Sequence, residues 1–202
     1  MNNMQDKVLF GIDFGSKRSG NTVIAVFKNM RVDFLDVEKD ADADTFILNA
    51  VEHYKPEVIF IDAPLSLPGR YTGLKNCKCY SYRHADVELR AMSPMFLGGL
   101  TARAIQIKDT CVAKGIRVYE TYPKAQATKY DLQKLGYKGN KLALKLCAEK
   151  VADSMHPNIR LCRKEIVSWH HLDALLALVS AMCHEQGHGQ VFGDPVEGQI
   201  YV

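Results

Sequence analysis

Two aspartates each follow a run of apolar residues, at the point where a buried strand would end. Asp13 follows residues 8–12 in "VLFGID", and Asp62 follows residues 58–61 in "VIFID". A carboxylate in such a place loses hydration, and two that meet repel each other unless a cation or a proton relieves the charge. A divalent metal ion is the usual solution, and Mg²⁺ or Mn²⁺ is expected because both suit carboxylate oxygens.

Two further segments supply side chains of the same kind. Glu120 lies in the alternating segment "IRVYETYP" (116–123), and Asp173 is the only acid in the apolar helical stretch "WHHLDALLALV". His170 precedes Asp173 by three residues, so both can lie on one helix face. The pattern predicts that Asp173 joins the two strand-end aspartates as a metal ligand. Glu120 or His170 would complete the site or orient an attacking water, and such metal sites hydrolyse phosphodiesters.

The order of elements would bring these residues together. Three β-rich segments with short polar breaks between them indicate antiparallel neighbours, and later strand–helix–strand crossovers indicate parallel ones. The predicted elements are strands at 7–15, 21–29 and 31–39, a helix at 42–55, a strand at 57–62, a helix at 97–114, a strand at 116–123, helices at 141–155 and 168–187, and a terminal hairpin around "GDPVEG". We therefore expect an α/β fold with a five-stranded mixed sheet and helices on both faces. Ligand sites in such sheets lie beyond the carboxyl ends of the strands.

Bulk properties narrow the class of protein. The 202 residues predict a single domain over 1–202, with an irregular, Pro- and Gly-rich insertion at about 64–96. No apolar run reaches the length of a membrane span, and the first residues lack the apolar stretch of a signal peptide, so a cytoplasmic protein without membrane contact is expected. The six cysteines are expected to be free thiols. Cys77 and Cys79, with His84 five residues on, leave a metal site open, although their spacing and the missing second pair are atypical.

The whole chain resembles domain-of-unknown-function family 429, regarded as predicted nucleases of ribonuclease H-like fold. The resembling segments, in the order of that family, are "GIDFGS", "FIDAPLSLP", "RHADVELR", "GGLTARAIQIKD", "VYETYP", "HHLDALLAL" and "GDPVEGQIYV". The resemblance implies a five-stranded ribonuclease H-like sheet and an acidic cluster at Asp13, Asp62 and Asp173, as in the RuvC-type junction resolvases. Those resolvases often carry two acids three residues apart on the last helix, whereas this chain has His170 at the earlier position.

Basic residues could hold the phosphates of such a substrate. Residues 114–150 contain nine bases and three acids, which indicates either a solvated helix face or a phosphate-binding flank. Arg90 and Arg103 lie in two of the resembling segments, and Lys124 follows the fifth strand, so these three are the predicted substrate-binding residues. Either arginine could instead neutralise nearby acids. DNA or RNA is the expected partner, and a homodimer is left open.

Each acid also has a plainer interpretation. Asp13 could hydrogen-bond the following turn, Asp62 could cap the backbone before Pro64, and Asp173 could be a first-turn acid favoured by the helix dipole. Glu120 could pair with a nearby Lys or Arg, and His170 could be structural.

Two alternative functions accompany the metal-dependent nuclease. "GIDFGSKRSGNTVIAV" also resembles the first phosphate loop of actin-like ATPases and sugar kinases, which would make the chain a nucleotide-binding phosphotransferase. Against that reading, the chain is short for two such domains and "IDAPLS" contains no glycine. The other alternative is a non-catalytic ribonuclease H-like module that binds nucleic acid or a partner protein.

Overall fold

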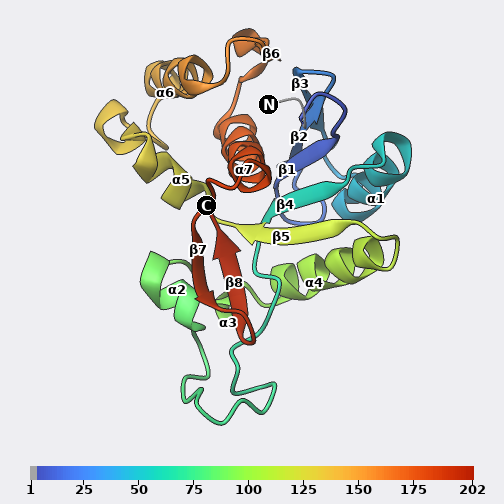
Figure 1. Cartoon of the computed structure of the whole chain (residues 1–202), viewed down its shortest axis with the longest axis vertical. Coiled ribbons are helices and arrows are strands. Elements are labelled where there is room, and N and C mark those ends of the chain that lie inside the picture. Colours follow the sequence, from blue (N-terminus) through green and yellow to red (C-terminus); the bar gives the residue numbers. More distant parts are fainter. Residues whose placement is uncertain (1–3) are drawn as a thin grey trace.

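The computed structural model describes residues 4–202, which form an α/β fold around one mixed sheet (Figure 1). Residues 1–3, part of the N-terminal stretch considered above for a signal peptide, lie outside the described range. The strands are β1 (Leu9–Asp13), β2 (Val23–Lys28), β3 (Arg31–Asp36), β4 (Val58–Asp62), β5 (Arg117–Thr121), β6 (Arg160–Leu161), β7 (Val191–Asp194) and β8 (Gly198–Tyr201). The helices are α1 (Ala43–Tyr54), α2 (His84–Leu89), α3 (Pro94–Leu97), α4 (Gly99–Val112), α5 (Pro123–Lys129), α6 (Lys141–Ser154) and α7 (Trp169–Glu185), with 3₁₀ turns at Leu132–Leu135 and Arg163–Glu165.

The sheet has the predicted strand directions but more strands than predicted. Its order is β6-β3-β2-β1-β4-β5-β8-β7, with β1, β2 and β3 antiparallel in succession and β1, β4 and β5 parallel. The expectation of five strands was wrong, because the described part of the chain forms eight. The predicted terminal hairpin exists as β7 and β8, but β8 also pairs in parallel with β5. It thereby covers a sheet edge that would otherwise expose unpaired backbone groups.

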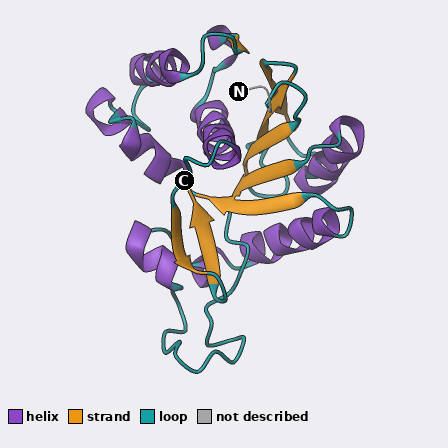
Figure 2. Ribbon diagram, viewed as in Figure 1, coloured by secondary structure: helices purple, strands orange, loops and turns teal. Residues whose placement is uncertain are grey.

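Helices cover both faces of the sheet (Figure 2), as predicted. Alternate residues of a strand point to opposite faces. On one face, side chains such as Leu9 and Phe60 pack against α7, α6 and α5. On the other, Phe10 and Ile59 pack against α1 and α4. The strands that carry the candidate acids are therefore buried on both sides, which explains their unbroken apolar runs.

One glycine sets how closely α7 approaches the sheet. A Cβ atom at Gly11 would lie 2.1 Å from the amide nitrogen of Leu178 and 2.4 Å from the carbonyl oxygen of Ala174. Only a residue without a side chain allows the backbones of β1 and α7 to come this close. The contact brings the first turn of α7 near the carboxyl end of β1, where Asp13 lies.

The predicted insertion lies between β4 and α4 and contains two short helices, α2 and α3. Its first part extends from the sheet as a long loop, at the bottom of Figure 1. Arg83, at the start of α2, is fully buried and reaches back to β5 by an ion pair with Glu120. The insertion is thus fixed to the sheet through its centre. Among the helices of residues 4–202, none has the length and apolar character needed to cross a membrane.

Candidate functional site

The two strand-end aspartates are direct neighbours in the sheet. Asp13 and Asp62 are register partners of the parallel strands β1 and β4. Each aspartate is an even number of residues from a strand residue that packs against α7: Asp13 from Leu9, and Asp62 from Phe60. Their carboxylates therefore lie on the α7 face of the sheet. The prediction that the two apolar runs deliver their acids to one edge is confirmed.

Helix α7 adds Asp173 and His170 to this edge. Ser168 caps the helix by accepting the amide of His171, which fixes where the first turn begins. Asp173 is 3% exposed, and the Nδ1 atom of His170 lies 2.6 Å from Oδ2 of Asp13. We refer to Asp13, Asp62 and Asp173, together with His170, as the acid edge.

A loop that sequence reasoning missed covers the acid edge. The Tyr137 hydroxyl donates to Oδ1 of Asp173 at 2.5 Å, and the ammonium group of Lys138 forms an ion pair with Oδ2. Trp169 holds the loop on α7 by donating from its indole nitrogen to the carbonyl oxygen of Gly139. The one signal in the sequence was the excess of bases over 114–150, which does not single out Lys138.

The three carboxylates perturb one another. Burial, followed by the charges of Asp13 and Asp173, raises the pKa of Asp62 well above its ordinary value. Burial also raises the pKa of Asp173 to about 6, although Lys138 opposes the shift. The hydrogen bond with Asp13 raises the pKa of His170. Asp62 has no hydrogen-bond or ion-pair partner for its side chain within residues 4–202, so it is the least compensated member.

The donor set suits a hard divalent cation in its chemistry. Three carboxylates with mutually unfavourable charge would be relieved by such an ion, and Mg²⁺ often takes one or two carboxylates, with waters or substrate phosphates as its other ligands. Within the described chain, no three His, Cys, Asp or Glu side chains are arranged to hold one ion together. His170 and Lys138 already pair with Asp13 and Asp173. An ion would therefore be held first by Asp62 and by Oδ1 of Asp13, because His170 pairs only with Oδ2 of Asp13.

Glu120 does not belong to the acid edge. Its register partner is Ile61, so it points to the α4 face, opposite to Asp62. Both of its oxygens are bound there by Arg83 at 2.6 Å, and one also accepts the amide of Leu65. A one-residue difference in register reverses the face of a strand residue. The structure thus favours the plainer interpretation of Glu120, pairing with an arginine.

The three predicted substrate-binding bases are in different situations. Arg103 is engaged by Asp44 and by the carbonyl oxygen of Gly15, and its guanidinium lies over the ring of Phe14. It therefore clamps the β1–β2 loop onto α1 and α4. Arg90 and Lys124 are exposed, and neither side chain has a hydrogen-bond or ion-pair partner within the described residues.

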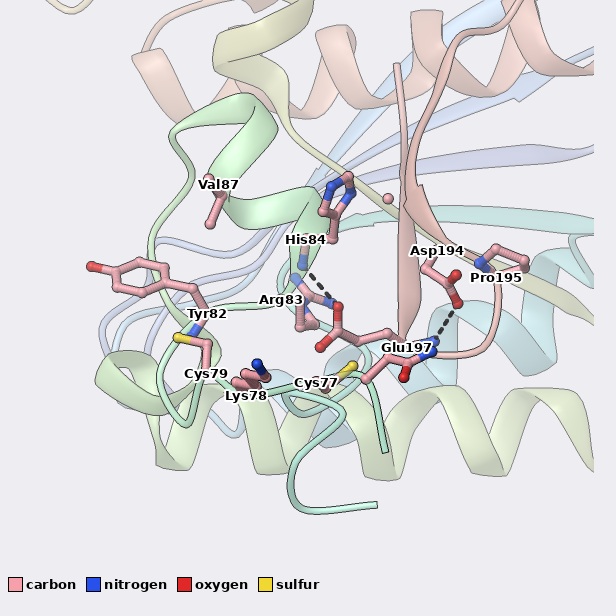
Figure 3. Close-up of a pocket in the computed structure, with 12 residues that line it drawn as sticks. Cys77, Lys78, Cys79, Tyr82, Arg83, His84, Val87, Asp194, Pro195 and Glu197 are labelled. Carbon is pink, nitrogen blue, oxygen red and sulfur yellow. Dashed lines mark hydrogen bonds between the residues drawn. The ribbon is translucent and has the colours of Figure 1, made fainter. Parts of the chain in front are cut away.

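Cys77 and Cys79 line a pocket of about 520 Å³ between α2 and the β7–β8 turn (Figure 3). Cys77 lies against Glu197, and burial raises the pKa of its thiol. Cys79 is turned toward Tyr82, whose amide donates to its sulfur at 3.3 Å. Glu197 accepts the amides of Gly69 and His84 and so fastens the insertion to the turn. Both cysteines are free thiols, and the chain described here offers no three-ligand group around them.

Comparison with known proteins does not extend this picture. No protein-family model matches the chain, and no curated protein is similar to it. The class of protein is given by the architecture: an α/β fold whose single eight-stranded mixed sheet begins with antiparallel hairpins and continues with parallel strands.

Proposed function

We propose that the chain is a metal-dependent nuclease of ribonuclease H-like fold that hydrolyses phosphodiester bonds at the acid edge. The observation that carries this proposal is the meeting of Asp13, Asp62 and Asp173 at the carboxyl ends of parallel strands. Crowded, under-compensated carboxylates cost stability, and such costs are concentrated at functional sites. The central order β3-β2-β1-β4-β5 supports the ribonuclease H-like part of the proposal, because its strand directions agree with that fold.

Each residue of the site has a role in this reaction. A bound Mg²⁺ or Mn²⁺ would supply an activated water and charge stabilisation at the phosphate. Asp13 and Asp62 would hold the ion, and Asp173 would contribute once Lys138 moves to a substrate phosphate. Asp13 orients the His170 ring by accepting a hydrogen bond from Nδ1, and in the protonated ring, which the raised pKa favours, Nε2 would donate a hydrogen bond to a phosphate oxygen.

The test is cleavage of labelled single-stranded and duplex DNA and RNA with Mg²⁺, with Mn²⁺ and with EDTA. We expect Asp13→Asn and Asp62→Asn to abolish metal-dependent cleavage while the far-UV circular dichroism spectrum stays unchanged. Asp109→Asn serves as the matched control, because Asp109 is an exposed acid on α4. Cleavage by Asp13→Asn at the wild-type rate would refute the assignment.

One observation favours the non-catalytic module as a second candidate. Two of the three acids already have partners in the chain itself, since Asp173 pairs with Lys138 and Asp13 with His170, so the acid edge is partly compensated without any metal. A thermal-shift titration with Mn²⁺ separates the two candidates. The nuclease requires a rise in melting temperature that Asp62→Asn loses, whereas retained nucleic-acid binding with no such rise would favour the module.

The phosphotransferase has less support from the loop between β1 and β2. The amide of Gly15 donates to Thr22, and the amides of Ser19 and Asn21 are also engaged within the loop. A phosphate loop needs such amides directed at the ligand. Calorimetry with ATP and Mg²⁺ tests this alternative, and a measurable heat of ATP binding would support it.

A further inference from the structure

Exposed apolar side chains gather on the insertion. Met92 is 60% exposed, Met95 36% and Phe96 70%, and the ring of Phe96 stands edge-on to that of Tyr82 at 5.9 Å. We call these four residues the apolar ridge. Single exposed apolar residues need no explanation, but neighbouring large ones mark an interaction surface.

The apolar ridge is firmly held. Ser93 caps α3 by accepting the amide of Met95, and its hydroxyl donates to the carbonyl oxygen of Ser81. Thr101 donates to the carbonyl oxygen of Pro94, which fixes α3 against α4. The ridge therefore presents its side chains without a large ordering cost on binding.

The ridge borders the acid edge. Met92 and Asp62 line the same small pocket of about 40 Å³, together with Tyr122. Asp62 also raises the pKa of Tyr122, after the larger effect of burial. A ligand that rests on Met92 would therefore lie next to Asp62, the least compensated carboxylate of the acid edge.

Two exposed basic residues lie close in sequence to residues of this surface. Arg90 precedes Met92 by two residues, and Lys124 follows Tyr122 by two. Both are exposed, and no acid within residues 4–202 pairs with either. The surface therefore suits a partner that has flat apolar groups on an anionic backbone. Unpaired nucleotides fit this description, whereas the base faces of a duplex are already stacked on one another.

We propose that the apolar ridge stacks unpaired bases of single-stranded nucleic acid, with Arg90 and Lys124 holding the adjoining phosphates. This inference rests on the proposed function, since it names the substrate form that the acid edge would receive. A protein partner or a second copy of the chain is the competing occupant.

The experiment measures binding of fluorescent 12-nucleotide thymidine single strands and of a 12-base-pair duplex by anisotropy, in EDTA and at one fixed salt concentration. We expect wild-type protein to prefer the single strand, and Phe96→Ala to bind it about tenfold more weakly, the loss of one base–aromatic stack. Phe96→Tyr retains a ring and should restore most of the affinity. Val112→Ala is the control, because Val112 is 53% exposed at the opposite end of α4.

Several outcomes would overturn the inference. One is equal affinity of Phe96→Ala and wild type for the single strand, and another is a preference of wild type for the duplex. A third is a concentration-dependent dimer of wild type in sedimentation that Phe96→Ala abolishes. The proposed function can fail on its own. If single strands bind through Phe96 but Asp13→Asn cleaves them as fast as wild type does, catalysis at the acid edge is refuted and binding at the apolar ridge stands. Absence of binding to both probes would overturn both proposals.

Discussion

Two groups of acids lie at the same end of the same sheet, on opposite faces. On the α4 face, Glu120 and Asp86 share the buried guanidinium of Arg83, and every contact is at 3.1 Å or less. On the α7 face, the acid edge has Lys138 and His170 as partial partners, and the Asp62 carboxylate has none in the described chain. Register separates them: Glu120 stands opposite Ile61, one residue before Asp62.

The comparison shows how compensation distinguishes a structural acid from a candidate catalytic one. A bidentate arginine satisfies carboxylates geometrically and leaves no donor for a ligand. At the acid edge, the Asp62 carboxylate has no partner within the described residues, and the resulting unfavourable electrostatic energy is one that a ligand could relieve. The Arg83 network therefore anchors the insertion, and the acid edge is the place to seek chemistry.

Removal of Arg83 should give the largest effect on stability. Arg83→Ala leaves Glu120 and Asp86 buried without their partner, and breaking a buried ion pair costs about 3–5 kcal/mol. Urea unfolding followed by circular dichroism measures the change. Arg90→Ala is the matched control and should stay within about 0.5 kcal/mol, since Arg90 is exposed. Equal urea midpoints for Arg83→Ala and Arg90→Ala would mean that the Arg83 network does not stabilise the fold as proposed.

A methyl group at Gly11 should damage the acid edge and spare the Arg83 network. Gly11→Ala drives a Cβ atom into the backbone of α7, and we expect a loss of about 3 kcal/mol as the helix shifts. Gly99→Ala is the control, because nothing lies within 4 Å of its Cβ position in α4. Unfolding free energies test both variants, and a neutral Gly11→Ala would contradict the close approach.

The pH dependence of stability should reveal the strain at Asp173. Burial raises the pKa of this residue from 3.8 to about 6, so the folded protein binds the proton more tightly than the unfolded chain. Its contribution is therefore full below pH 4 and is lost as the pH rises through 6, by on the order of 2 kcal/mol. Asp173→Asn lacks this titration. In EDTA, the unfolding free energy of Asp173→Asn should rise relative to that of wild type as the pH increases from 4 to 6. Parallel pH profiles of the two unfolding free energies would argue against the raised pKa.

The smallest effect is expected from the loop over the acid edge. Tyr137→Phe removes one hydrogen bond to Asp173 and should cost about 1 kcal/mol. Because that bond lowers the pKa of Asp173, the variant should also raise this pKa, which carboxyl carbon NMR can follow. Tyr71→Phe, at an exposed tyrosine, should change neither quantity. An unshifted Asp173 in Tyr137→Phe would mean that the loop does not support the site.

Local pattern was sufficient for much of the fold and for the strand-end acids. Apolar runs that end in Asp13 and Asp62 predict buried parallel strands, and the inward face of α7 predicts Asp173. The face of Glu120 could not be predicted, because the register between β4 and β5 depends on packing between distant segments. The predicted number of strands was too low because no local sequence signal indicates that β8 pairs with β5.

The loop over the acid edge escaped prediction for a related reason. Tyr137 and Lys138 lie in an irregular segment with no periodicity, and what places them is the docking of the loop on Trp169. In the sequence, Arg83 is one of several arginines in and around the insertion. Nothing in the sequence distinguished a buried network from an exposed phosphate contact.

The bond between His170 and Asp13 joins residues that are 157 positions apart. During synthesis the amino-terminal strands emerge long before α7, so the acid edge cannot exist on a nascent chain until that helix has been made. Contacts of such long range also slow folding, because the intervening chain loses conformational entropy before the contacts form and stabilise the fold. A chain that terminates ahead of residue 169 would lack Asp173 and His170, and it would also lack the helix that packs on β1 and β2.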